Sequence, residues 1–335
     1  MDDDDDRTTS LLYCHEDPLL VSTPPPPAAA PPVDGLPSSV PAVEDLDDDE
    51  ELLLAEYAAR QRCYAPSTSY LEHLLMEQQQ QQQAASHGVS AARAKAVHYI
   101  LYAFGRLGLA PATAFNAVNY LDRFLSINCH LRWEAWMVEL VSVACLSIAC
   151  KLDEVTIPSL HHLQMEEVMS HSFRSSTIRD MELTLLKALQ WRLACVTPYS
   201  FLHLLLPQGC TTSAATASRC TRLLLRSLSE TSLLRFDSSV IASSALRCVA
   251  LQGNQQADIS CRISRLIHSE CQLDNDTDEC FEMMNSLYAS FNLNNHQMYS
   301  DEQWSPISVI PFQTDGTVNR KLTEAEIDLS QARGK

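Results

Sequence analysis

Residues 137–152 form the segment that most constrains the fold, because almost every position in it is apolar or small. Val141, Val143, Ala144 and Ala149 fall on different sides of a helix, so no polar stripe is left to face water. A helix that is apolar all round needs neighbours on every side, and its small residues let those neighbours approach closely. The segment therefore predicts a buried hub helix at the centre of a helical bundle.

The remainder of the chain favours an all-α fold with two such bundles. The 335 residues, 46% of them apolar, suffice for one large or two ordinary domains. Only eight glycines occur, candidate strands are few, and long stretches have helical periodicity. A second apolar and small segment, 236–251, follows the first by about a hundred residues. Because each hub helix needs its own surrounding helices, we predict two tandem five-helix bundles.

Proline, glycine and capping residues place the ends of several expected helices. Pro111 opens a helix at a position where its missing N–H costs nothing, and Thr197-Pro198 opens the second bundle in the same way. Ser90 is expected to cap a helix that Gly105 and Gly108 end. The expected parts are a disordered tail (1–50), an N-terminal helix and Gln-rich linker (51–84), the first bundle (85–195), the second bundle (196–292) and a flexible C-terminal tail (293–335).

The acidity of the chain is concentrated in its N-terminal tail. The net charge is −18, and residues 1–51 hold fifteen acidic groups against Arg7 alone. Acidic runs and Pro-rich stretches cannot bury enough surface to offset the entropy of ordering, so this tail is predicted to be disordered; the glutamine run Gln78–Gln83 is likewise expected to be a solvated spacer. Phosphate contacts demand a basic face, and this balance therefore disfavours a nucleic-acid partner.

Several other function classes are disfavoured by what the sequence lacks. The twelve cysteines fall mostly on apolar helical faces, and we read them as reduced core thiols without a secretory signal peptide before them. No CxxC pair or His/Cys cluster has zinc spacing, so no metal is expected. We find no nucleotide-binding glycine loop, nucleophile elbow or paired carboxylates, and we expect no cofactor and no catalysis. No uninterrupted apolar stretch has the length of a membrane span.

Four motifs in order resemble the cyclin box. They are VNYLDRFLS (118–126), VACLSIACKLDE (143–154), RDMELTLLKALQWRL (179–193) and TPYSFL (197–202). The pattern WMxxLxSVACLS, which begins at Trp136, is similar to the plant D-type cyclins. The resemblance extends over about residues 90–291 and is stronger in its first half. It implies a noncatalytic subunit that binds and activates a cyclin-dependent kinase and promotes the G1/S transition.

The resemblance also implies a kinase-binding site. In cyclins, a lysine that ends the hub helix and a glutamate in the fifth helix meet at the kinase interface, and the motifs place these at Lys151 and Glu182. Glu154 and Trp191 match further contacts. Docking would bias a bistable helix of the kinase toward its active placement. The residues alone leave ordinary roles open, since a lysine in the last turn of any helix is favoured by the macrodipole and a tryptophan near a helix end is commonly a core residue.

Near the N-terminus, Leu12, Cys14 and Glu16 form an LxCxE pattern. Side chains alternate along an extended chain, so these three project to one side while Tyr13 and His15 face away. Short extended peptides bind through backbone pairing and alternate side-chain pockets. In D-type cyclins the motif engages retinoblastoma-type pocket proteins, and the resemblance implies such a partner here.

One part of the cyclin pattern is altered. Many cyclins dock substrate and inhibitor peptides of the RxL type on an apolar surface of the first helix of the box, written MRAIL. The corresponding stretch here is 92–96, where Lys95 replaces an apolar residue while Arg93 remains, and Tyr99 stands where tryptophan is usual. Binding of kinase inhibitor proteins at this surface therefore stays open.

Two rival classes share parts of this description. A transcription factor of the TFIIB type has a doubled five-helix architecture, but it needs a basic face and usually a zinc ribbon, and neither is found in the sequence. A helical scaffold that binds peptides without a kinase is the second rival. Nuclear localisation, with a cytoplasmic fraction, is expected from the resemblance alone.

Overall fold

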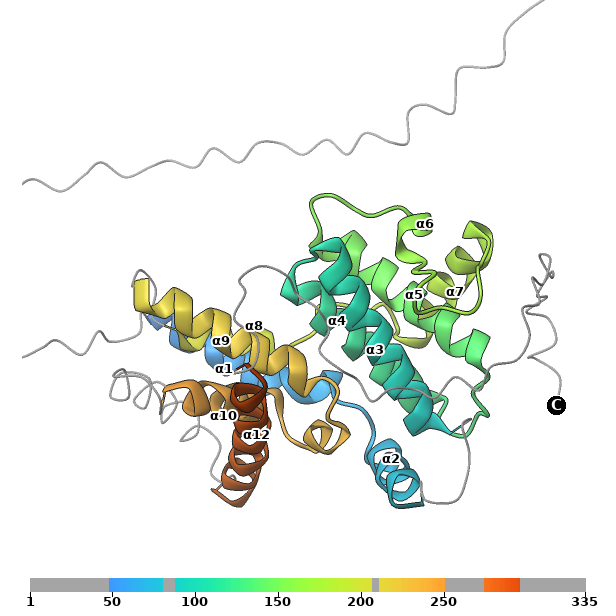
Figure 1. Ribbon diagram of the computed structural model, residues 1–335. Helices are drawn as coiled ribbons and strands as arrows, with labels where there is room; N and C mark the ends of the chain where they lie inside the picture. The colour runs from blue at the N-terminus through green and yellow to red at the C-terminus, as the bar shows by residue number, and fades with distance from the viewer. Residues whose placement is uncertain (1–47, 81–87, 207–210, 251–273, 296–335) are drawn as a thin grey trace, which may run out of the picture. The chain divides into compact units, whose positions relative to one another are not determined.

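The computed structural model describes residues 48–80, 88–206, 211–250 and 274–295. All regular structure in these ranges is helical, and they contain no strand. The predicted all-α fold with two successive helical bundles is thus confirmed (Figure 1). The tails expected to be disordered fall almost wholly outside the described residues.

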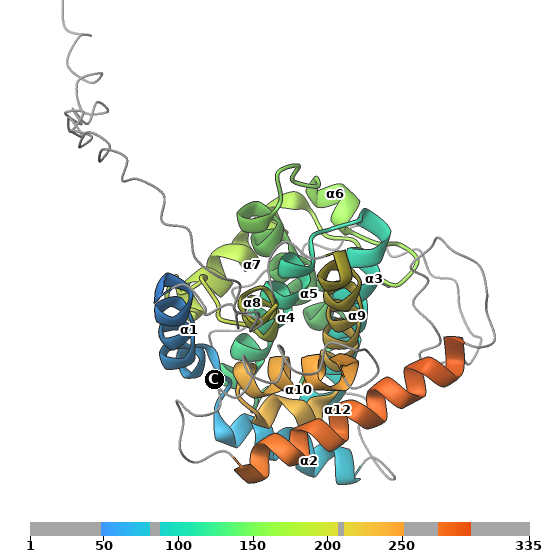
Figure 2. The same cartoon turned by 90° about the vertical axis from the view of Figure 1, so that its left-hand side faces the viewer.

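In the first bundle, α5 is the helix that the others surround. It contacts α3, α4, α6 and α7, and in both views it lies among them (Figures 1 and 2). Every residue from 138 to 150 is buried, which confirms the predicted hub. The bounds are α3 (Val89–Leu107), α4 (Pro111–Ile127), α5 (Ala135–Asp153), α6 (Leu160–Leu163) and α7 (Ser175–Ala188).

Helix α5 is also the one helix of the described ranges that is long and apolar enough to cross a membrane. Its mean hydropathy is 1.7, yet 72% of its apolar window is buried inside the protein. The apolar surface of α5 is covered by its neighbouring helices, as expected for the core helix of a bundle.

The second half repeats the arrangement around α10. This helix contacts α8, α9 and α12, and its positions from Ser239 to Leu246 are all buried. Residues 251–273 of the predicted second bundle lie outside the described residues, and α12 continues to Asn295, beyond the predicted end of the bundle at 292. The bounds are α8 (Pro198–Leu205), α9 (Thr211–Ser227), the 3₁₀ helix η2 (Thr231–Arg235), α10 (Ser238–Ala250) and α12 (Asp274–Asn295).

Three N-terminal elements precede the first bundle: α1 (Asp48–Gln61), the 3₁₀ helix η1 (Arg62–Tyr64) and α2 (Thr68–Gln80). Helix α1 contacts α8 and α10 of the second half, whereas α2 packs on α3 and η2. The edge of Tyr57 meets the ring of Phe201, with centroids 5.9 Å apart. The guanidinium of Arg62 donates two hydrogen bonds to Asp237, at 3.1 and 3.0 Å.

Two helices in this region extend past the boundaries expected from the sequence. Helix α1 starts at Asp48, inside the tail expected to be disordered. Helix α2 runs through Gln80, so the glutamine run expected to be a spacer is helical at its start. Glutamine is a good helix former, and the helix continues through it.

The start of α3 shows a contact between helices that the sequence analysis missed. Gly88, and not Ser90, is the N-cap, and the Glu77 carboxylate of α2 accepts hydrogen bonds from the amides of Val89 at 3.4 Å and Ser90 at 2.8 Å. A Cβ on Gly88 would lie 2.5 Å from Oε2 of Glu77, so a side chain at this position would displace the Glu77 carboxylate. The free amides of α3 are thus capped from another helix.

The other helix ends agree with the turn chemistry. Gly108 caps α3 in the left-handed conformation with φ of 62°, although Gly105 lies within the helix and does not end it. Pro111 is the first residue of α4, and Thr197 with Ser200 forms a capping box before Pro198. These positions suit Pro and Gly for the reasons that predicted them.

Candidate functional site

Lys151 and Glu182 lie side by side on neighbouring helices of the first bundle. The Lys151 ammonium stands in the last turn of α5, at 2.6 Å from both carboxylate oxygens of Glu182 on α7. The structure therefore joins the two residues that the cyclin motifs singled out. Whether they bind a kinase stays a prediction.

The two partners differ in exposure. The Lys151 side chain is 44% exposed, whereas that of Glu182 is 9% exposed. Ser147, one turn before Lys151 and buried, also donates its hydroxyl to Oε1 of Glu182 at 2.5 Å. The carboxylate is thus fixed from within the protein, and it holds the ammonium at the surface.

Ser147 was missed by the sequence analysis. Its signal is a polar residue four positions before the lysine in an otherwise apolar helix. That spacing puts both side chains on one face of α5, toward α7.

Glu154, the third predicted site residue, is engaged inside the chain. Its Oε1 accepts hydrogen bonds from the amide of Ala110 at 2.7 Å and from the hydroxyl of Thr113 at 2.6 Å. These groups lie at the N-terminus of α4, where a carboxylate caps free amides and meets the positive end of the helix dipole. The structure shows Glu154 joining the end of α5 to the start of α4.

Trp191, the fourth predicted residue, is 63% exposed, so the core alternative for it is wrong. Gln190 and Trp191 both have positive φ, at 54° and 59°. This left-handed conformation is uncommon for residues with a Cβ. It turns the chain sharply after α7 and leaves the indole at the surface.

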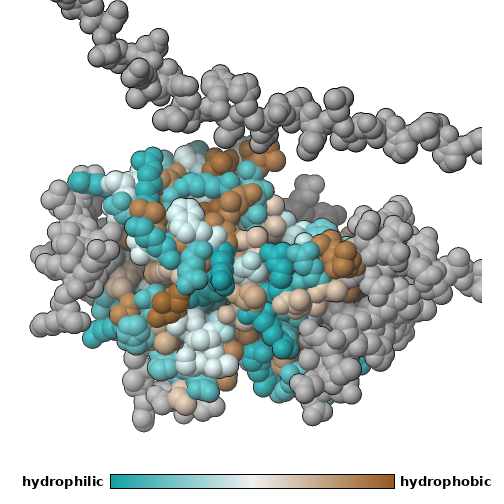
Figure 3. All heavy atoms as spheres, turned by 180° about the vertical axis from the view of Figure 1, so that it is seen from behind, coloured by the Kyte–Doolittle hydropathy of each residue, from teal (hydrophilic) through white to brown (hydrophobic). Residues whose placement is uncertain are grey.

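Exposed apolar side chains lie close in sequence to Lys151 or Glu182, within α5 and α7 or shortly after these helices end. We call this group the apolar rim, and it comprises Leu152, Val155, Ile157, Leu183 and Trp191. Apolar and hydrophilic side chains are interspersed over the described surface in Figure 3, and colour alone does not single out one site. The rim is distinguished by its closeness in sequence to the two residues of a fixed ion pair.

A hollow of about 470 Å³ opens beside the rim. Its walls include Leu152, Trp191 and Leu193, together with Tyr57 and Arg60 of α1. Asp153 also faces it, accepting a hydrogen bond from Asn116 at 2.9 Å. Burial raises the pKa of the Asp153 carboxyl, the Asn116 bond opposes this shift, and the nearby Glu154 adds to it. The hollow is thus partly apolar, with charged groups at its edge, and suits a side chain of a protein partner.

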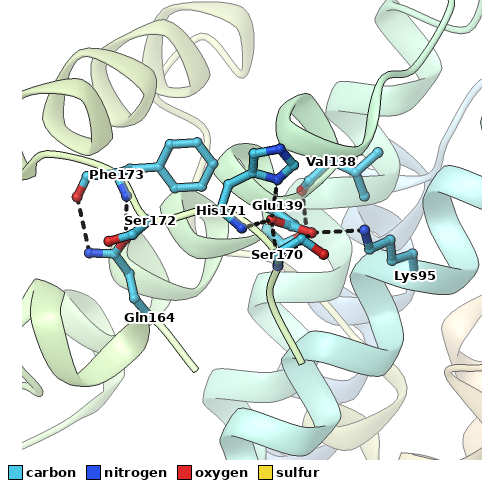
Figure 4. A network of polar contacts seen from close by, with 9 residues as sticks. Lys95, Val138, Glu139, Gln164, Ser170, His171, Ser172 and Phe173 are labelled. Carbon is cyan, nitrogen blue, oxygen red and sulfur yellow. Dashed lines mark hydrogen bonds and ion pairs between the residues drawn. The ribbon is translucent and has the colours of Figure 1, made fainter. Parts of the chain in front are cut away.

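The altered docking stretch on α3 forms a different kind of site. Glu139 of α5, whose side chain is 3% exposed, accepts hydrogen bonds from the ammonium of Lys95 at 2.8 Å and from Nδ1 of His171 at 2.9 Å (Figure 4). The amides of Ser170 and His171 also donate to it. Burial acts to raise the Glu139 pKa, but the bonds from Lys95, His171 and Ser170 outweigh it and hold the pKa below its usual value. Lys95 therefore neutralises a buried carboxylate here.

Arg93 in the same stretch belongs to the core. Its guanidinium binds both carboxylate oxygens of Asp122 and is buried. This arginine therefore does not present its side chain to a docked peptide. Binding of inhibitor proteins at the stretch stays a prediction.

The cysteines of the described ranges are free thiols. Burial raises the pKa of Cys150, Cys195, Cys220 and Cys248 to about 12. In these ranges no group of three or more His, Cys, Asp or Glu side chains could hold a metal ion. The predicted Leu12, Cys14 and Glu16 motif lies outside the described residues.

Comparison with known proteins identifies the family. The family models described as "Cyclin, N-terminal domain" and "Cyclin, C-terminal domain" match residues 55–194 and 196–312. The protein named "Putative cyclin-D7-1" from Oryza sativa subsp. japonica is 55% identical over 82% of this chain and 80% of its own length. The chain belongs to the plant D-type cyclins.

Further relatives agree with this assignment. Cyclin-D1-1 of Arabidopsis thaliana is 38% identical over 48% of this D-type cyclin, which spans 48% of that relative's length. Among solved structures, a viral cyclin from herpesvirus saimiri aligns with a TM-score of 0.56 and 16% identity, over 71% of this chain and 96% of that one. This last likeness shows the fold alone. Cyclins are regulatory subunits and not catalysts.

Proposed function

We propose that this D-type cyclin binds a cyclin-dependent kinase through Lys151, Glu182 and the apolar rim, and thereby activates it. The observation that carries the proposal is the fixed ion pair at the surface, together with exposed apolar side chains close to it in the sequence and a hollow that Leu152 and Trp191 line. Larger exposed apolar surfaces rimmed by polar groups mark interaction sites, and an aromatic anchor such as Trp191 is typical of their energetic centres.

The geometry assigns each partner a task. An ammonium has three N–H donors, and two of them are taken up by the two oxygens of Glu182. The third donor is left for a carbonyl at the end of a kinase helix or loop. Glu182, itself held by Ser147, keeps the ammonium in place, so little side-chain freedom is lost when the kinase binds.

Activation follows from where such a surface docks. A kinase needs its C helix placed so that a glutamate on it pairs with the ATP-binding lysine. A partner that binds only the active placement of that helix shifts the kinase population toward it. The cyclin then raises the rate without supplying any reacting group.

The affinity of purified cyclin for a recombinant plant cyclin-dependent kinase tests the proposal. Lys151→Ala should weaken binding by about 2 to 5 kcal/mol, since it removes a desolvated donor from the interface. The matched control is Arg106→Ala, which removes an exposed cation from the last turn of α3 and should leave the affinity unchanged. Unchanged affinity of Lys151→Ala would refute the assignment.

A second variant guards against loss of folding. Lys151→Ala leaves the nearly buried Glu182 carboxylate with Ser147 as its only partner among the bonds described above. The double change Lys151→Ala with Glu182→Gln leaves no unpaired charge and should keep the fold while binding remains weak. The unfolding temperature of each variant reports on the fold separately from affinity.

We further propose that Leu12, Cys14 and Glu16 recruit a retinoblastoma-related pocket protein to the bound kinase, that the complex promotes the G1/S transition, and that it acts in the nucleus. The spacing of the three side chains on one side of an extended segment supports the recruitment. Membership of the D-type cyclins supports the cell-cycle role and the localisation.

A further inference from the structure

The segment after α7 is fixed by side chains of α4. The Arg123 guanidinium donates to the carbonyl of Arg192 at 2.7 Å and to that of Leu189 at 3.3 Å. The Tyr120 hydroxyl donates to the carbonyl of Leu193 at 2.8 Å. Residues 120 and 123 lie one helical turn apart on the same face of α4, so both side chains bind the chain segment that follows α7.

The turn that they grip contains Gln190 and Trp191, both in the left-handed conformation. The amide of Trp191 donates to the carbonyl of Leu186 at 3.0 Å, and that of Gln190 to the carbonyl of Lys187 at 3.1 Å. Two successive residues with a Cβ at positive φ are sterically costly, and such backbone persists only where its surroundings hold it.

Arg123 is suited to hold the turn because its guanidinium is a rigid fork. One branch reaches the carbonyl before the left-handed pair, and the other reaches the carbonyl after it. The guanidinium is itself kept in place by the ring of Tyr64, whose centroid is 5.3 Å away. The turn lies between two hollows, one beside the apolar rim and one of about 300 Å³ lined by Arg123, Gln190 and Arg192.

We propose that Arg123 is a positioning residue that forces the turn at 189–192 and thereby presents Trp191 as a preformed aromatic anchor of the docking surface. The inference rests on the proposed kinase docking for its consequence, but the turn itself can be tested without a kinase. An anchor held in its bound conformation loses little entropy on association, so loosening it weakens binding although no contact atom is removed.

Hydrogen exchange of the purified cyclin tests the positioning step. Arg123→Lys keeps the charge but loses the fork, and the amides of 190–192 should exchange at least tenfold faster while those of α5 keep their rates. Gln190→Gly is the second variant, since glycine adopts positive φ without a steric cost; added to Arg123→Lys, it should bring the exchange of the 191 and 192 amides back toward the parent rates while the fold is retained. The control Arg132→Lys alters a surface arginine that is 72% exposed and should change nothing. Unaltered exchange at 190–192 in Arg123→Lys would overturn the proposal.

Affinity for the same recombinant kinase tests the consequence. We expect Arg123→Lys and Trp191→Ala each to weaken binding about tenfold, and the double variant to be no weaker than Trp191→Ala, because both act through one side chain. If the double variant loses affinity by the product of the two single losses, Arg123 does not act through Trp191 and the proposal is overturned. If Lys151→Ala and Trp191→Ala leave affinity unchanged while exchange at 190–192 still rises in Arg123→Lys, the kinase proposal fails and the positioning of the turn by Arg123 stands.

Discussion

The guanidinium of Arg93 and the carboxylate of Asp122 form a two-pronged ion pair inside the first bundle. Nε lies 2.7 Å from Oδ1 and Nη2 lies 3.0 Å from Oδ2, and the two side chains are only 2% and 5% exposed. Nη2 also donates to the carbonyl of Leu228 in the second half, and the hydroxyl of Tyr70 donates to Asp122. The pair therefore links α3, α4, α2 and the chain after α9.

Removing one side of this pair should destabilise the fold strongly. Arg93→Ala leaves a buried carboxylate without its cation, and we expect the free energy of unfolding to fall by about 3 to 5 kcal/mol. Tyr70 cannot replace the cation, because a protonated phenol is neutral; burial first, and then the Asp122 charge, raises the pKa of this phenol and keeps it in that neutral form. Urea unfolding measures the loss, and Arg106→Ala on the same helix should stay within about 0.5 kcal/mol of the parent. A loss below about 1 kcal/mol for Arg93→Ala would contradict the role.

Glu139 should make the stability of the cyclin depend on pH in the acid range. Because the folded protein holds its pKa below the unfolded value of 4.5, its contribution is present above pH 4.5 and is lost as the pH falls through the folded pKa. Glu139→Gln should therefore cost about 1 to 3 kcal/mol at pH 7, and the gap to the parent should close below pH 4.5. Unfolding in urea across this range measures the gap.

The control for this pH dependence is Glu166→Gln. Glu166 is exposed and lies between α6 and α7, in the segment that also contains Ser170 and His171. Its replacement should leave the free energy of unfolding within about 0.5 kcal/mol of the parent at every pH. If the difference in free energy of unfolding between the parent and Glu139→Gln grows as the pH falls, the proposed stabilisation by the ionised Glu139 is contradicted.

The buried thiols should resist alkylation in the folded cyclin. The thiolate is the reactive form, and burial raises the pKa of Cys150 to about 12 and that of Cys280 to about 11. Exposed Cys63 should therefore react with iodoacetamide at pH 8 much faster than either. Mass spectrometry of each peptide gives the rates, and unfolding in urea should make them similar. Equal rates in the folded protein would show that these thiols are not in a closed core.

The LxCxE motif should bind a pocket protein independently of the kinase. Cys14→Ala or Glu16→Ala should abolish capture by a recombinant retinoblastoma-related protein, because each empties one of the pockets that read alternate side chains. His15→Ala is the matched control, since its side chain faces away in an extended peptide. Kinase affinity should be the same for all three, and its loss together with capture would indicate an unfolded protein.

The architecture was predictable because its strongest signals are local. A helix that is apolar on every side has to be a core helix, and the residues around Pro111 and Thr197 specify helix starts by their own chemistry. The cap that Glu77 places on α3 was missed because the acceptor comes from a different helix. A single sequence carries no signal for such a contact between elements.

The candidate site was predicted by resemblance and not by the residues alone. Nothing in the spacing of Lys151 and Glu182, 31 positions apart, indicates that their charged groups meet at 2.6 Å. Ser147 and Arg123 were missed for a related reason, since their roles depend on which carboxylate or carbonyl the neighbouring helix brings close. Propensity and periodicity describe single helices, whereas these roles arise from packing between them.

The first helix of the described chain belongs by its contacts to the last bundle. Tyr57 meets Phe201, the side chain of Gln61 accepts from the amide of Ser239, and Arg62 pairs with Asp237. The helix that comes first in the sequence therefore packs on the half of the protein that comes last. A chimaera that exchanges bundles between two relatives will keep these contacts only if residues 48–62 travel with the C-terminal half, and a simple cut before Thr197 would separate α1 from the helices on which it rests.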